Sequence, residues 1–114
     1  MDLDKVQGKI IKSISFRNDY GLCIFLKGGD VLEVEAPVCS EWNTADKVRV
    51  KHGARFVNLF INCVGETEDD DFDCWDVNTV QVLTTRGSLT WTVKCDSCDD
   101  LVTHYHKGGL NARN

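Results

Sequence analysis

LCIFLKGGDVLEVEA, residues 22–36, is the stretch that decides the fold class of this chain. Leu22, Ile24 and Leu26 alternate with Cys23, Phe25 and Lys27. The alternation resumes with Leu32, Val34 and Ala36 against Glu33 and Glu35. A period of two is typical of β-strands, in which successive side chains point to opposite faces of the sheet. The glycine pair between the two runs supplies the positive φ that a tight turn needs. The stretch therefore predicts a β-hairpin.

Similar patterns follow along the rest of the chain. Residues 89–95 (LTWTVKC) alternate strictly, and Arg86-Gly87-Ser88 before them is typical of a turn, so a second hairpin is expected. Further strand patterns cover residues 8–16, 47–51, 55–64, 78–85 and 101–106. The total predicts an all-β domain of seven or eight antiparallel strands in a small sandwich or a partly closed barrel. An α+β variant with one short helix between Val38 and Lys47 stays open.

Length and composition indicate one domain. The 114 residues suffice for one core, and we expect a β-rich domain over residues 1–107 with a flexible tail from 108 to 114. Neither a membrane-spanning apolar run nor a signal-peptide pattern is seen, which favours the cytoplasm and no membrane association. In that compartment the six cysteines are expected to be reduced, without disulfides. An exposed edge strand could also pair two copies into a homodimer.

Charge is distributed unevenly along the chain. Residues 1–65 carry nine Lys/Arg and eight Asp/Glu, whereas residues 66–114 carry four and ten. Seven of those acids fall between Glu66 and Asp76, with no base among them. Because adjacent like charges repel, we expect this segment to form a loop rather than a strand. The overall balance disfavours direct binding of nucleic acid, which needs clustered Lys/Arg.

The acidic segment is the leading candidate for a functional surface. Clustered carboxylates can steer a basic protein toward a docking surface, and neighbouring aromatic side chains can anchor it. The alternative is a solvated charge run that only keeps the domain soluble. The candidate partner-binding residues are Glu66, Glu68, Asp69, Asp70, Asp71, Phe72, Asp73 and Trp75.

A zinc site is a second possibility. Cys95 and Cys98 are three residues apart, and His104 and His106 would project from one face of a strand, so the four could form a tetrahedral Cys₂His₂ site. The spacing matches no standard zinc module, and Cys95 falls on the apolar face of its strand. The alternative is one buried cysteine, one turn cysteine and two histidines on a polar face.

Catalysis has little support in the sequence. The chain contains no nucleophile-elbow motif and no glycine-rich phosphate loop, so we expect a protein that is not an enzyme. A third possibility is a sponge, a protein that sequesters a small nucleotide messenger. Because the chain is acidic, it would need a local basic pocket to bind such a messenger. Candidate residues for such a pocket are Arg49, Lys51, Arg55 and Arg86.

Two stretches carry a resemblance. GKIIKSISFRNDYGLCIFLKGGDVLEV (8–34) and VLTTRGSLTWTVK (82–94) resemble segments of small uncharacterised accessory proteins of bacteriophages and bacteria. The first stretch is similar in its opening G-K-x-I strand and hairpin, and the second in its T-x-x-G-S-L-T turn. The resemblance implies a compact, non-enzymatic protein of the inhibitor or immunity type, such as an anti-defence protein. It brings no catalytic residues with it.

Overall fold

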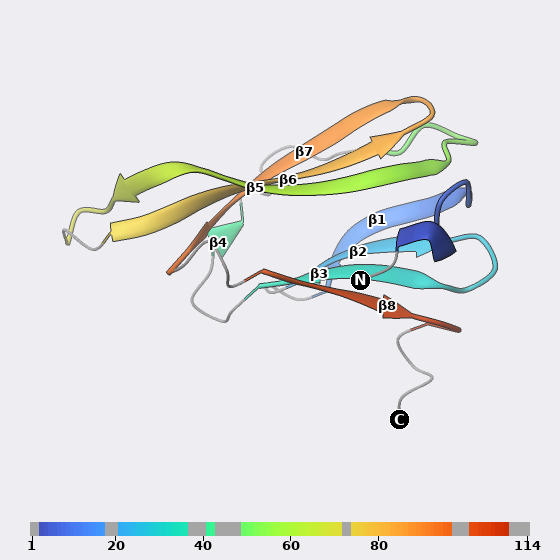
Figure 1. Cartoon of the computed structure of the whole chain (residues 1–114), viewed down its shortest axis with the longest axis horizontal. Coiled ribbons are helices and arrows are strands. Elements are labelled where there is room, and N and C mark those ends of the chain that lie inside the picture. The colour runs from blue at the N-terminus through green and yellow to red at the C-terminus, as the bar shows by residue number, and fades with distance from the viewer. Residues whose placement is uncertain are drawn as a thin grey trace.

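The structure is a computed structural model, and it describes residues 3–17, 21–36, 41–42, 49–71, 74–96 and 101–109. Its eight labelled strands form two four-stranded sheets, β1-β2-β3-β8 and β4-β7-β6-β5. All neighbouring strands within the sheets are antiparallel. Figure 1 shows the two sheets as two layers, one above the other. The predicted all-β class and antiparallel sandwich are therefore confirmed, and the sheets do not close into a barrel.

The first sheet is built around the hairpin predicted from residues 22–36. It consists of β1 (Ile11–Arg17), β2 (Gly21–Leu26), β3 (Val31–Glu35) and β8 (Val102–His106). The turn between β2 and β3 places both glycines at positive φ, 103° for Gly28 and 100° for Gly29, a backbone conformation that a residue with a Cβ adopts only under strain. A short 3₁₀ helix, η1 (Leu3–Lys5), precedes β1.

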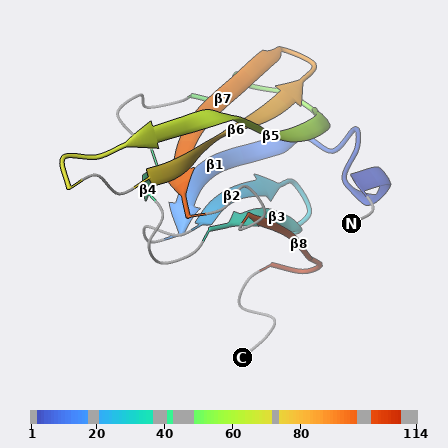
Figure 2. The same ribbon diagram turned by 60° about the vertical axis from the view of Figure 1, so that its left-hand side comes forward.

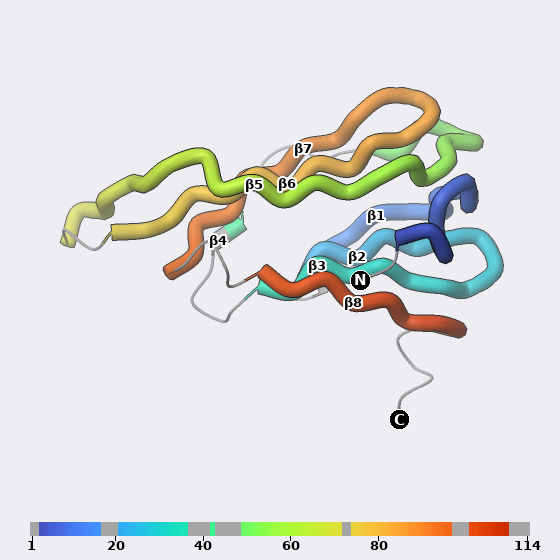
Figure 3. The backbone as a smooth tube through the Cα atoms, viewed as in Figure 1, coloured from blue at the N-terminus to red at the C-terminus, as the bar shows by residue number. Residues whose placement is uncertain are grey.

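The second sheet contains the longest strands of the molecule. It consists of β4 (Glu41–Trp42), β5 (Phe56–Glu68), β6 (Cys74–Thr84) and β7 (Gly87–Cys95). Figure 3 shows the far end of the β5–β6 hairpin extending beyond the first sheet, so the strands of the first sheet do not cover it. Figure 2, turned by 60° about the vertical axis, shows the same end of the β5–β6 hairpin extending beyond the first sheet.

The core lies between the two sheets. Phe56, Leu22 and Leu32 have no exposed surface, and Trp91 is 4% exposed. Burying side chains of this size contributes about 1.5–3 kcal/mol each relative to leaving them in water. The two layers are also connected at the start of β1, where the Ile11 N–H donates to the Ala54 carbonyl at 2.9 Å.

Two local expectations are wrong. The acidic segment is not all loop, because β5 continues to Glu68 and pairs in register with β6. These carboxylates are exposed, so water screens their repulsion while the backbone ladder is kept. Residues 49–51 belong to no strand, since an alternation of only five residues does not distinguish a strand from an extended connection.

Other expectations concern parts of the chain that the structure covers only in part. The short helix considered between Val38 and Lys47 falls mostly outside the described residues. The described residues of that segment are Glu41 and Trp42, and they form strand β4.

Within the described ranges, no helix has the length and apolar composition to cross a membrane.

Candidate functional site

The acidic residues gather at the far end of the β5–β6 hairpin. We call residues 66–71 and 74–76 the acidic hairpin end. Its strands pair Glu66 with Asp76, Thr67 with Trp75 and Glu68 with Cys74. Alternation along β5 places Glu66 and Glu68 on one face and turns Thr67 to the other. Pairing of β5 with β6 thus concentrates carboxylates that the sequence spreads over eleven residues.

The turn of the acidic hairpin end is held by two hydrogen bonds that one carboxylate accepts. Asp69 Oδ1 accepts from the Asp71 N–H at 2.9 Å, and Asp69 Oδ2 accepts from Trp75 Nε1 at 3.1 Å. The first contact is the local side-chain-to-backbone bond that favours aspartate in turns. The second hydrogen bond ties the turn to β6. The Trp75 side chain is half-buried.

Four of the predicted partner-binding carboxylates are fully available on this surface. Glu66, Glu68, Asp70 and Asp71 are exposed, and none of them forms an ion pair with another residue that the structure describes. Val64, beside them on β5, is 59% exposed. Phe72 and Asp73 lie outside the described residues.

Of the predicted zinc ligands that the structure describes, Cys95 is not brought together with the two histidines, whose ring centroids are 6.0 Å apart. Cys95 is fully buried in the core between the sheets. His104 and His106 lie on β8 in the first sheet, and His104 pairs in register with Glu33, which shares the face opposite the core-facing Leu32. Cys98 lies outside the described residues. Among the residues with described positions, no group of three or more His, Cys, Asp or Glu side chains could hold a metal ion.

One cysteine departs from the expectation of reduced thiols. Cys63, on the exposed part of β5, is disulfide-bonded, so that expectation is wrong for this residue. Cys23, Cys74 and Cys95 are thiols. The expectation was based on the cellular compartment alone, which says nothing about which thiols the fold brings within bonding distance.

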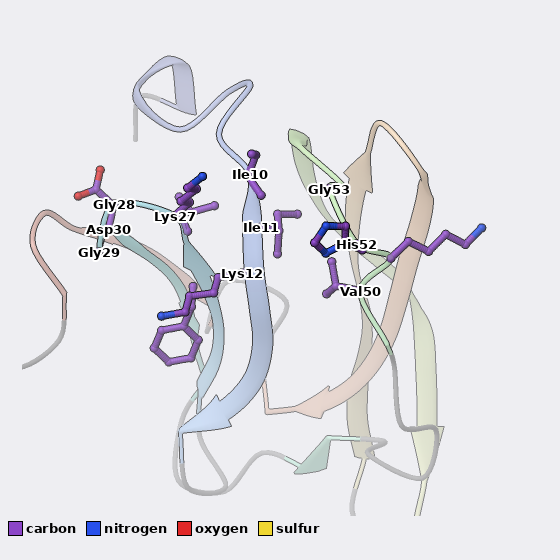
Figure 4. A pocket seen from close by; sticks show the side chains of 13 residues that line it. Ile10, Ile11, Lys12, Lys27, Gly28, Gly29, Asp30, Val50, His52 and Gly53 are labelled. Atoms are coloured by element: carbon purple, nitrogen blue, oxygen red, sulfur yellow. The ribbon is translucent and has the colours of Figure 1, made fainter.

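A pocket is lined by segments that lie at the opposite end of the molecule from the acidic hairpin end (Figure 1). Its volume is about 740 Å³, and it is lined by segments 10–12, 25–30 and 50–53. Figure 4 shows β1 running between the β2–β3 turn on one side and the Val50–Gly53 segment on the other. Because this pocket contains Lys12, Lys27 and Lys51, we call it the basic pocket.

Only one of the basic residues singled out from the sequence lines this pocket. Lys51 is part of the lining, whereas Arg49, Arg55 and Arg86 are not. Arg55 instead donates from Nη1 to the Gly8 carbonyl at 2.7 Å, where β1 and β5 begin. Lys12 and Lys27, which also line the pocket, were not singled out because each lies more than twenty residues from Lys51 in the sequence.

A buried polar network beside the pocket was also missed. The Asp30 carboxylate accepts hydrogen bonds from Lys9 Nζ, from the Tyr105 hydroxyl at 2.7 Å and from the Gly108 N–H at 3.2 Å. These bonds, chiefly those from Lys9 and Tyr105, lower the pKa of Asp30 from 3.8 to about 2. The same contacts with Asp30 raise the pKa values of Lys9 and Tyr105. The network connects the β2–β3 turn with β8 and the segment before β1.

A second polar contact lies on the other face of the first sheet. Glu33 is 3% exposed, and its Oε1 is 3.0 Å from His106 Nε2. The sulfur of Cys23 lies 3.8 Å from Glu33 Oε2. The Glu33 side chain also approaches Gly21, where a Cβ would lie 2.8 Å from Oε2. These contacts connect β2, β3 and β8 within the first sheet.

Comparison with protein-family models, with curated proteins and with solved structures found no match.

Proposed function

We propose that this protein is a non-enzymatic binding protein that inhibits or neutralises a basic partner protein by docking it on the acidic hairpin end. The observation that carries the proposal is the exposure of Glu66, Glu68, Asp70 and Asp71 on one projecting hairpin, without ion pairs to other described residues.

The physical effect of such a surface is steering and selection. Carboxylates of one sign on a projecting end attract a cationic patch and repel acidic proteins, which raises the association rate at low salt. Exposed charge pairs contribute only about 0.2–1 kcal/mol each, so several must act together. The exposed side chain of Val64 and the half-buried Trp75 offer apolar contact area beside the charges.

The resemblance to accessory proteins of the inhibitor or immunity type supports the same proposal. In that class a small acidic protein acts by occupying its target, and no catalytic group is required. A partner of this kind would be a nucleic-acid-binding enzyme or a toxin, because both present clustered Lys and Arg. Cytoplasmic location remains part of the proposal.

Photo-crosslinking tests this function. A benzophenone amino acid at Asp70 is expected to form an adduct with a basic protein in the cells where the chain is expressed. The same residue placed at Arg86, in the β6–β7 turn, is the control. A dominant adduct from position 86, with none from position 70, would remove the acidic hairpin end as the docking surface.

A further inference from the structure

The exposed apolar side chains lie on the edge strands of the two sheets. Within the described ranges, the large apolar residues left exposed are Phe60 at 41%, Val64 at 59% and Val102 at 47%. Phe60 and Val64 belong to β5, which ends the second sheet, and Val102 belongs to β8, which ends the first (green and red in Figure 1). Exposed apolar residues are ordinary when scattered singly, but a concentration of them marks an interaction surface.

A groove connects the two edge strands. Its volume is about 480 Å³, and its lining comes from η1, β5 and segment 101–103. Apart from Thr103 the lining residues are apolar: Leu3, Leu59, Ile61, Leu101 and Val102. All of them except Val102 are half-buried and pack against the core. The core of the sandwich is therefore open to solvent on the side where β5 and β8 end their sheets.

The backbone of β5 has a free edge along most of its length. β6 pairs with β5 on one side throughout. On the other side residues 8–10 pair only with the start of β5, where the Phe56 N–H donates to the Lys9 carbonyl and the Phe56 carbonyl accepts from the Gly8 N–H. From Asn58 onward, no strand among the described residues runs along this edge. A row of N–H and C=O groups at an edge is a template for pairing with another strand.

Residues 58–63 form the regular part of this edge. The register with β6 shifts just before and just after them, and between the two shifts the pairing is continuous. The six residues, NLFINC, include no charge. Natural edge strands are commonly protected by bulges or by charged side chains. Here both devices lie outside the run, at the register shifts and at Glu66 and Glu68.

The backbone groups of this run point in the direction that pairing needs. The Leu59 N–H donates to Asn58 Oδ1 at 2.8 Å, so it is not used in the ladder with β6. Backbone groups of alternate residues point to the same edge, which places those of Ile61 on the free edge with those of Leu59. The carbonyl of an added strand would replace the Asn58 oxygen as the acceptor.

We infer that two copies of this chain form a dimer by antiparallel pairing of their β5 strands about Phe60. The sequence of residues 58–62, NLFIN, reads nearly the same in both directions. Pairing about its centre sets asparagine opposite asparagine, Leu59 opposite Ile61, and Phe60 opposite its own copy. Such an interface is isologous, because the same residues contribute from both copies.

Both faces of the combined sheet gain matched contacts from this register. Toward the first sheet, Leu59 and Ile61 of the two copies meet and join the apolar groove of one copy to that of the other. On the opposite face the two Phe60 side chains meet. Because Leu59 and Ile61 form the hydrogen-bonded pairs, Phe60 lies in a non-hydrogen-bonded pair, in which opposite side chains are closest. Cross-strand aromatic pairs of this kind stabilise sheets.

Charge favours a second copy in this arrangement. The exposed Arg55 precedes β5, and the exposed Glu66 and Glu68 end it. Antiparallel pairing brings the basic start of each strand toward the acidic end of the other. At about 3.3 Å per residue, the Glu68 side chains of the two copies lie about 50 Å apart, well beyond a Debye length of about 8–10 Å. Asp70 and Asp71 remain at the outer ends of the dimer, so the dimer does not depend on the proposed docking of a basic partner.

Sedimentation equilibrium of the intact chain tests the dimer. We expect the mass to rise reversibly from that of one chain toward that of two between micromolar and millimolar concentration, because a short ladder with an apolar groove is typical of a weak interface. Mass spectrometry under denaturing, non-reducing conditions is expected to show single chains. This control detects a covalent dimer made through an exposed thiol such as Cys74.

Phe60→Lys and Thr90→Lys separate the proposed contact from the effect of charge. Both exposed residues lie in one row of the second sheet, since Phe60 pairs with Gln81 and Gln81 pairs with Thr90. Phe60→Lys sets two ammonium groups opposite each other and removes the aromatic pair, so we expect at least about tenfold weaker dimerisation. Thr90→Lys adds the same charge two strands away and should change the affinity by less than about twofold. NMR spectra at low concentration report whether each variant is folded.

Intermolecular contacts identify the strand and its register. In a mixture of ¹³C-labelled and unlabelled chains, isotope-filtered NOE spectra are expected to show Leu59 of one copy against Ile61 of the other.

Four results would overturn the inference. The first is a monomer at millimolar concentration, which would leave this edge to a strand of another protein. The second is a dimer that is held only by a disulfide. The third is equal dimerisation of the Phe60→Lys and Thr90→Lys variants. The fourth is a set of intermolecular contacts confined to other strands, such as β8.

Discussion

Replacing Asp30 with asparagine tests how the polar network beside the basic pocket stabilises the fold. The side chain of Asp30 is only 12% exposed, and its carboxylate is ion-paired with Lys9. Its other bonds come from the Tyr105 hydroxyl and the Gly108 N–H. The amide introduced by Asp30→Asn would keep the shape of the side chain but lose its negative charge, so the change isolates the electrostatic contribution.

The expected magnitude follows from the pKa. A pKa that falls from 3.8 to about 2 on folding corresponds to about 2 kcal/mol of stability, at about 1.4 kcal/mol for each tenfold change in proton affinity. Solvent reaches the Lys9 side chain, which is 37% exposed, so we expect Asp30→Asn to cost about 1–2 kcal/mol at pH 7. Because the folded-state pKa is the lower one, this stability is present above pH 3.8 and is lost as the pH falls toward 2.

Urea denaturation at a series of pH values measures the effect. The difference in free energy of unfolding between the wild type and Asp30→Asn is expected to be largest at pH 7 and to shrink between about pH 4 and about pH 2. Asp70→Asn, on the exposed acidic hairpin end, is the control and should change stability by less than about 0.5 kcal/mol. A constant difference across this pH range would refute the assignment of the stabilising charge to Asp30.

Three further predictions concern the sheets. Gly21→Ala places a Cβ 2.8 Å from Glu33 Oε2, so a buried carboxylate must move, and a loss of about 1–3 kcal/mol is expected in urea denaturation; unchanged stability would contradict this contact. Asn78 is 1% exposed, and its side-chain amide makes no hydrogen bond with the described residues. We therefore expect Asn78→Val to raise the melting temperature through a gain of about 1 kcal/mol, and a lower melting temperature would show that the amide has a partner. Alkylation followed by mass spectrometry should label Cys63 only after a reductant is added, and labelling before reduction would show that no disulfide is formed.

The strand pattern could be predicted where one face of a strand is buried. In β7, Trp91, Val93 and Cys95 contact the core while the residues between them are more exposed, so the sequence has a clear period of two. The far part of β5 has no buried face, and its last residues are charged. Only backbone pairing with β6 makes that part a strand, and a pattern of side chains does not record such pairing.

The candidate site was partly predictable for a similar reason. The acidic hairpin end comes from one short stretch of sequence, so its charge was visible in the composition of residues 66–76. The basic pocket is lined by Lys12, Lys27 and Lys51, which come from three separate segments of the sequence. The Asp30 network includes a hydrogen bond between residues 78 positions apart, Asp30 and Gly108, and no local pattern indicates it.

The central claim is that a basic partner docks on the acidic hairpin end, and the salt dependence of its binding tests this most directly. The partner recovered by crosslinking from position 70 is titrated against Asp70→Asn/Asp71→Asn and against Asp4→Asn/Glu35→Gln, two variants with the same net charge. We predict that the hairpin variant binds about two- to tenfold more weakly at low salt and shows a flatter dependence on salt. Equal affinity and equal salt dependence in the two variants would contradict the claim.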